Sequence, residues 1–100
     1  MSNIFFTPNE VSLNIASNLR DKRLLQNLSQ ASLSRVSGVS YGVIKKFEKT
    51  GKISLESLLK IAMALGCLSE CFQLFKIKDI ENIKTIDELI NKKIRKRGRK

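Results

Sequence analysis

The sequence predicts an all-α fold, from the spacing of its apolar residues and from the residues that stand at the ends of each apolar stripe. Apolar residues recur every three or four positions from Thr7 to Phe75, whereas strand-like alternation occurs only in short pieces. Capping side chains precede these stripes, and glycines follow several of them. The 100 residues make room for one domain, and 42% apolar residues can fill one small core. We therefore predict one compact domain of five helices over residues 7–75.

The first helix has a complete start signal. Thr7 can cap it, Pro8 fits its first position, and Glu10 stands where a capping box needs an acidic residue. Phe6 and Val11 occupy the two positions of a hydrophobic staple. The predicted apolar stripe consists of Val11, Ile15, Ala16 and Leu19, and the basic residues of the last turn are Arg20, Lys22 and Arg23.

Two short helices are predicted, one before and one after Gly38, and this glycine suits a left-handed turn between them. Ser29 caps the helix over 30–37, and Ser40 caps the helix over 41–48. The small Ser34 allows the two helices to approach closely. Such a pair outlines a helix-turn-helix, although a helical hairpin in any small bundle has a similar pattern. The residues predicted to bury the corner are Leu33, Val36, Val39, Ile44 and Phe47.

Two further helices complete the predicted domain. Residues 50–52 form a turn, Ser54 caps the fourth helix and Gly66 ends it. Its apolar stripe consists of Leu55, Leu58, Leu59, Ala62 and Leu65. The fifth helix is predicted over 69–75, with one apolar face made of Leu68, Phe72 and Phe75. A connector over 76–91 follows, with a short helix capped by Thr85.

Positive charge is concentrated in a tail over residues 92–100. The chain carries 19 basic and 9 acidic residues, a net charge of +10. Seven basic residues and no acidic ones lie in the tail, so the other 91 residues have a net charge of +3. A tail of this kind indicates affinity for nucleic acid, with an anionic lipid surface or a merely solvated terminus as alternatives. We expect the tail to be mobile.

Several classes of function are disfavoured. Histidine is absent, which removes the usual general base and the commonest metal ligand. Cys67 and Cys71 form half a zinc site at best and fit small buried residues in a reducing compartment better. Ser57 and Lys60 spell an acyl-enzyme motif whose partner motifs are missing. We expect no enzyme, no metal and no cofactor.

The sequence shows neither a signal peptide nor an apolar run long enough to cross a membrane. We therefore expect a cytoplasmic protein.

The stretch from Leu19 to Leu65 resembles the lambda-repressor-like, Cro/repressor (XRE-type) DNA-binding domains of bacteria and phages. The segments that carry the resemblance are Leu19–Arg23, Leu28–Gln30, Ser37–Ser40, Ile44–Glu48 and Leu58–Gly66. It implies a five-helix domain, acting as a homodimer on double-stranded DNA with a palindromic operator, in which residues 41–48 are the recognition helix.

The resemblance also implies roles for individual residues. Arg23 and Glu48 match a buried structural ion pair, and Gln30 matches a phosphate contact at the start of the second helix. Ser40 would cap the recognition helix and touch the DNA backbone. The residues implied to face base edges are Tyr41, Gly42, Lys45 and Lys46, and those implied to hold phosphates from the following loop are Lys49 and Lys52. For the lysines, an ordinary solvated face is the alternative.

Gly42 departs from the family pattern, which usually has a polar side chain at this position. Glycine inside a helix costs roughly 1 kcal/mol relative to alanine and presents no side chain to a base. Either it lets the helix sit closer to the DNA, or this position reads no base. Tyr41, Lys45 and Lys46 must then carry more of the specificity.

A narrower resemblance concerns the regulators encoded beside HipA-type kinase toxins, the HipB-type antitoxins. It rests on residues 42–55, on residues 64–67 and on the basic ending 95–100. It implies a protein that represses its own operon and binds the kinase. The sequence thus predicts a dimeric transcriptional repressor, with the dimer interface at Leu68, Phe72 and Phe75. The alternative is an antitoxin or adaptor that covers a partner protein without a DNA role, and a polybasic membrane-surface peptide is a third interpretation.

Overall fold

The computed structural model describes residues 6–77, which form five helices and, over that range, no strand. This confirms the predicted all-α fold. The predicted helix capped by Thr85 and the tail over 92–100 lie outside the described residues. Within residues 6–77, no helix has the length and apolar character that crossing a bilayer requires. The helices are α1 (Pro8–Leu25), α2 (Gln30–Ser37), α3 (Tyr41–Thr50), α4 (Leu55–Ala64) and α5 (Leu68–Phe72).

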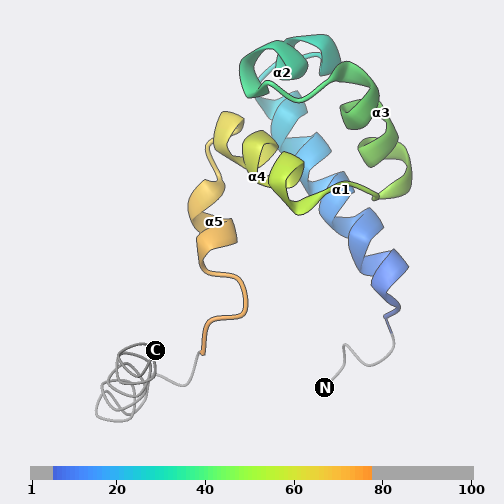
Figure 1. The fold of residues 1–100 in the computed structure, drawn as a ribbon, viewed down its shortest axis with the longest axis vertical. Coiled ribbons are helices and arrows are strands. Elements are labelled where there is room, and N and C mark those ends of the chain that lie inside the picture. Colours follow the sequence, from blue (N-terminus) through green and yellow to red (C-terminus); the bar gives the residue numbers. More distant parts are fainter. Residues whose placement is uncertain (1–5, 78–100) are drawn as a thin grey trace, which may run out of the picture.

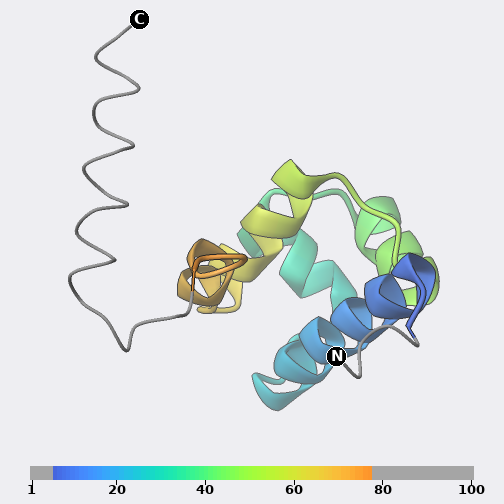
Figure 2. The ribbon, with the colours of Figure 1, turned by 90° about the horizontal axis from the view of Figure 1, so that it is seen from below.

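The helices pack around a small core beside α1, the longest of them. α3 packs against α1, α2 packs against α3 and α4, and α4 packs against α5 (Figure 1). The first turn of α1 and the short α5 point downward in Figure 1 on opposite sides of the domain, and Figure 2 shows from below that α5 lies beside α4 at one edge of the bundle. The buried apolar residues are Ala16, Leu19, Leu33, Val39, Ile44, Phe47, Ile61, Ala62, Leu65 and Cys67.

Side-chain caps begin four of the helices at the positions that the sequence predicted. Thr7 and Glu10 form a reciprocal capping box at α1, with hydrogen bonds of 3.0 and 3.1 Å. The hydroxyls of Ser29, Ser40 and Ser54 accept hydrogen bonds from backbone N–H groups in the first turns of α2, α3 and α4. These caps fix where each helix begins, and with it the rotation of each apolar stripe toward the core.

The turn between α2 and α3 has the features that the sequence predicted. Gly38 ends α2 in the left-handed conformation, with φ of +78°. The Ser34 hydroxyl donates a 2.6 Å hydrogen bond to the Val39 carbonyl across the turn. The small Ser34 side chain therefore leaves room for the close approach of the following segment and also provides a hydrogen bond for its Val39 carbonyl.

Gly51 ends α3 and brings it against α1. Its φ is also +78°, and its N–H donates to the Phe47 carbonyl at 2.7 Å. A Cβ at this position would lie 2.8 Å from the carbonyl carbon of Ser12 and 2.9 Å from the nitrogen of Leu13. Glycine is thus required twice here, for the backbone conformation and for the close approach of the two helices.

The predicted core is wrong at several positions. Val36 and Leu55 are 57% and 66% exposed, and Val11 and Ile15 are also largely exposed. Their helical spacing is right, but the described elements leave them largely uncovered, since α2 buries Leu33 in place of Val36. Conversely, the apolar stripe predicted for α4 omits Ile61, which is 1% exposed.

The bounds of two helices also differ from the prediction. α3 continues to Thr50 rather than ending at Glu48, because the left-handed residue that stops it is Gly51. α5 covers Leu68–Phe72 rather than 69–75 and has no side-chain cap. Phe75 has a φ of +61°, so the chain has already left the helix there, and Phe75 does not continue the face of Leu68 and Phe72.

Candidate nucleic-acid interface

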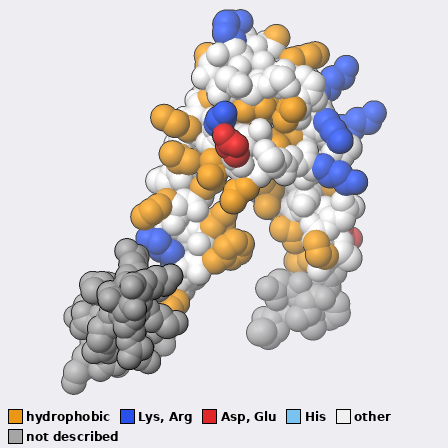
Figure 3. All heavy atoms as spheres, in the orientation of Figure 1, with side chains coloured by type: hydrophobic (Ala, Val, Ile, Leu, Met, Phe, Trp, Pro, Cys, Tyr) orange, Lys and Arg blue, Asp and Glu red, His pale blue; other side chains and the backbone are white. Residues whose placement is uncertain are grey.

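α3 has one buried and one basic side. Ile44 and Phe47 are 0% and 2% exposed and anchor the helix in the core. The opposite side is exposed and carries Lys45, Lys46 and Lys49. Figure 3 shows basic side chains gathered over this helix. This gives the domain a positively charged edge along α3.

Tyr41 and Lys45 lie together on that exposed side. Tyr41 is 48% exposed, and the Lys45 Nζ atom lies 5.9 Å from the centre of its ring. A cation at this distance is at the outer limit of attraction to an aromatic ring. The tyrosine thus lies beside the lysine ammonium on one turn of helix and leaves it exposed to solvent.

Lys49 and Lys52 lie on the two sides of the end of α3. Lys49 lies in the last turn of the helix, so its predicted position in the following loop is wrong. Lys52 does lie in the loop, after Gly51, and is exposed. The predicted phosphate-binding pair is therefore divided between a helix and a loop.

The first turns of α2 and α3 expose backbone donors. Ser29 and Ser40 each satisfy one N–H group of the helix that follows. The earliest N–H groups of a helix have no acceptor within it, so anions are favoured at such ends. Gln30, the first residue of α2, is partly buried, and its side-chain amide donates to the Glu48 carboxylate at 2.9 Å.

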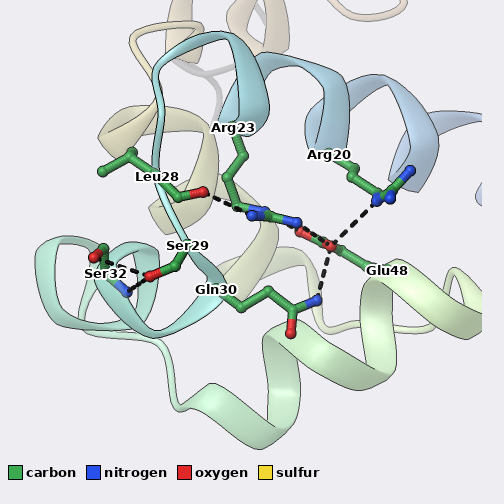
Figure 4. Close-up of polar contacts among 7 residues, drawn as sticks. All are labelled: Arg20, Arg23, Leu28, Ser29, Gln30, Ser32 and Glu48. Atoms are coloured by element: carbon green, nitrogen blue, oxygen red, sulfur yellow. Dashed lines mark hydrogen bonds and ion pairs between the residues drawn. The ribbon is translucent and has the colours of Figure 1, made fainter.

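Arg23 and Glu48 form a buried, two-pronged ion pair between α1 and α3 (Figure 4). The Arg23 Nε and Nη2 atoms lie 2.7 and 2.9 Å from the two carboxylate oxygens. The third donor of the guanidinium, Nη1, binds the Leu28 carbonyl at 2.7 Å. The two side chains are only 8% and 7% exposed. One guanidinium therefore connects α1, the loop before α2, and α3.

The neighbours of Glu48 keep it ionised. Burial alone would raise the pKa of this carboxyl group, but hydrogen bonds from Arg23 and Gln30 and the nearby positive charges outweigh it. The net result is a pKa below the usual glutamate value. The charge of Glu48 is thus part of the folded structure at neutral pH.

Arg20 was not among the predicted site residues, yet it reaches the same carboxylate. Its Nε atom lies 4.0 Å from Glu48 Oε1, and its side chain remains 55% exposed. Arg20, Gln30, Lys45, Glu48 and Lys49 together line a shallow, open hollow between α1, α2 and α3. Arg20 precedes Arg23 by one helical turn, and that spacing is the sequence signal that could have identified it.

Gly42 lies in the first turn of α3 and has no packing role in the described structure. A Cβ built there meets no atom within 4 Å, and the backbone does not require a positive φ. Unlike Gly51, this glycine is therefore not needed for the domain to fold.

The residues predicted to form a dimer interface are solvent-exposed. Leu68, Phe72 and Phe75 are 39%, 70% and 94% exposed. Cys67 is buried and Cys71 half-buried, and both are free thiols. Burial raises the pKa of the Cys67 thiol, which keeps it protonated. Among residues 6–77, no three potential metal-ligating side chains cluster.

A family model of the helix-turn-helix type matches residues 19–70, more than half of the chain. A comparison with curated proteins gave no match. The matched range runs from the last turns of α1 into α5 and contains the whole basic side of α3. The chain therefore belongs to the XRE-type helix-turn-helix family and is a DNA-binding regulator.

Proposed function

We propose that this protein is a dimeric transcriptional repressor that binds a palindromic operator, acts in the cytoplasm and controls its own operon. The observation that carries this proposal is the division of α3 into a buried side and an exposed basic side. An α-helix held in this way fits the major groove of B-form DNA, where lysine ammonium groups can bind the N7 and O6 atoms of guanine.

The proposed contacts divide into two kinds. Those to base edges come from the exposed residues Tyr41, Gly42, Lys45 and Lys46. Those to phosphates come from the helix starts and from the end of α3, namely Gln30, Ser40, Lys49 and Lys52. Contacts of the second kind set the position of the protein on the duplex, and contacts of the first kind distinguish sequences.

A homodimer would allow this domain to bind a longer DNA site than a single copy can cover. One recognition helix covers few base pairs, whereas a two-fold dimer places two of them about 34–36 Å apart, one turn of DNA. The exposed apolar residues Leu68, Phe72 and Phe75 are the proposed interface.

The test of the proposed function is the replacement of Lys45 by alanine. We expect affinity for DNA from the protein's own upstream region to fall by about 1–3 kcal/mol, and affinity for random DNA to fall less. Lys60→Ala is the matched control, because Lys60 is 52% exposed on α4 and pairs with Glu56 instead. Equal losses on both DNAs would assign Lys45 to a phosphate. No binding by the unaltered protein would refute the function.

The antitoxin role is a separate part of the proposal and rests on the resemblance of residues 42–55 and 64–67 to HipB-type regulators. It predicts a HipA-type kinase gene beside this one and a stable complex between the two products.

The tail over 92–100 would add affinity for DNA without selecting sequence. Its deletion would then reduce binding to cognate and random DNA by the same factor and lower the salt dependence. Loss of kinase binding with an unchanged salt dependence would instead make the tail a protein-docking element.

A further inference from the structure

The hollow between α1, α2 and α3 combines cations from two helices with an amide from the third. Arg20 comes from α1, Lys45 and Lys49 come from α3, and Gln30 begins α2. All three cations are exposed. The single acidic group in the hollow is Glu48, whose carboxylate lies at the bottom of it, 7% exposed.

Glu48 does not need Arg20 to be satisfied. Its two oxygens already accept hydrogen bonds of 2.7 and 2.9 Å from Arg23 and one of 2.9 Å from Gln30. Arg20 stands at 4.0 Å, beyond hydrogen-bonding distance, and is more than half exposed (Figure 4). The buried Arg23 neutralises the carboxylate, so Arg20 is held there only by a 4.0 Å ion pair, and Lys45 and Lys49 have no acidic partner in the hollow.

We propose that Arg20 and Lys49, with the amide of Gln30, form one cradle for a phosphodiester group of DNA, with Arg20 as its principal ligand and Lys45 at its edge, turned to the bases. This inference rests on the proposed DNA binding and adds a contact from α1 to it. A guanidinium suits the role because its planar set of N–H donors matches two phosphate oxygens. The Glu48 carboxylate holds Arg20 near the cradle before DNA arrives, and a phosphate then offers it a more exposed and better aligned acceptor.

The geometry favours a DNA phosphate over other anions. The hollow adjoins the exposed side of α3, so a helix seated in the major groove carries the cradle to the sugar–phosphate backbone that borders the groove. The hollow is open and shallow, which suits one group on a long polymer better than an enclosed small ion. Gln30 keeps a second amide N–H for the phosphate while the first remains on Glu48.

The experiment compares Arg20→Gln with Lys22→Gln in the full chain. Lys22 lies two residues further along α1, pairs with Glu70 at 3.4 Å and lines the groove between α1 and α5. Both variants lose one charge from the same helix, on different sides. Binding to cognate and random duplexes is measured across a salt series. We expect Arg20→Gln to lower the slope of log K against log salt by about 0.9, the value for one phosphate, on both duplexes. Lys22→Gln keeps the slope of the unaltered protein.

Two further measurements are needed. One tests whether Arg20→Gln changes stability as well as DNA binding, and the other tests whether Arg20 responds to DNA or to any phosphate. Thermal unfolding of Arg20→Gln should match that of the unaltered protein, because Arg23 and Gln30 still hold Glu48. In NMR spectra, the Arg20 Nε–Hε resonance should move on addition of DNA and stay in place with inorganic phosphate at the same phosphate concentration.

Each contrary outcome has a distinct meaning. An unchanged slope in Arg20→Gln, with normal salt-dependent binding by the unaltered protein, overturns the cradle and leaves the proposed function standing. A lowered melting temperature that accounts for the lost binding makes Arg20 structural and also overturns it. An equal response of Nε–Hε to inorganic phosphate makes the hollow a general anion site. Absence of DNA binding by the unaltered protein overturns both proposals.

Discussion

Gly51 at the end of α3 lies so close to Ser12 of α1 that a Cβ there would be 2.8 Å from the Ser12 carbonyl carbon. The atoms it would meet belong to helical backbone and cannot rotate aside. A left-handed residue other than glycine costs roughly 1–2 kcal/mol, and overpacking adds about 1–3 kcal/mol. We therefore expect Gly51→Ala to lower the free energy of unfolding by roughly 2–5 kcal/mol, measured by urea denaturation.

Gly38→Ala is the matched control for that variant. Gly38 has the same φ of +78°, but a Cβ there meets nothing within 4 Å. It should therefore show the conformational cost alone, so the difference between the two variants measures the contact of α3 with α1. Equal losses in both would mean that α1 and α3 can move apart without cost.

Gly42→Ala should have the opposite effect. Position 42 has helical backbone and open space around a Cβ, so alanine should stabilise the domain by up to about 1 kcal/mol, seen as a higher melting temperature. DNA affinity then separates the two interpretations of this glycine. A loss of affinity in the more stable variant means that the helix needs the space to approach DNA, and unchanged affinity means that the position reads no base. A drop in melting temperature would contradict the prediction.

The pair between Arg23 and Glu48 predicts a specific loss of stability in acid. The folded-state pKa of Glu48 lies below its usual value, so its stabilising effect is complete above the unfolded-state pKa, about 4.3. That stability is lost as the pH falls through the lower folded-state pKa. At pH 7, Glu48→Gln should be about 3–5 kcal/mol less stable than the unaltered protein, and the gap should narrow steadily below about pH 4.

A double variant keeps this prediction testable if the single one does not fold. Arg23→Met with Glu48→Met removes both charges at once and leaves no unpaired charge in the interior, so it should be more stable than Glu48→Gln. Urea denaturation at several pH values checks both comparisons. A gap that stays constant between pH 7 and pH 3 would show that the Glu48 charge does not stabilise the fold.

The proposed dimer interface predicts the effect of Phe72→Lys. Phe72 is 70% exposed, so the change should leave the monomer folded, and a charge buried between two copies should dissociate the dimer. Sedimentation equilibrium without DNA measures this directly. Val36→Lys is the control, because Val36 is comparably exposed on α2, away from this interface. If Phe72→Lys remains dimeric, the interface lies elsewhere.

Local signals predicted the local features of the fold. The starts of α1 to α4 follow from capping side chains within three residues of each start, and the turn at Gly38 follows from a conformation that glycine adopts readily. The pairing of Arg23 with Glu48 spans 25 positions and was expected only through the resemblance to a family, because no local pattern joins the two residues.

Features that depend on neighbouring elements were not predictable in the same way. Val36 and Ile61 have similar apolar character, yet one is 57% exposed and the other 1%, since only the packing of α2 and α4 decides which side is covered. The left-handed Phe75 breaks an apolar pattern that continues smoothly in the sequence. The hollow beside Arg20 exists only because three helices meet there.

The contacts that orient α3 are separate from the side chains that it exposes. Arg23, Glu48 and Gln30 hold the helix from its inner side, while positions 41, 45 and 46 face outward. Under the proposed function, substitutions at those three positions change the chemistry offered to the major groove without a compensating change in the core. The proposal therefore implies that one scaffold of this kind can serve different DNA sites through changes confined to the exposed side of α3.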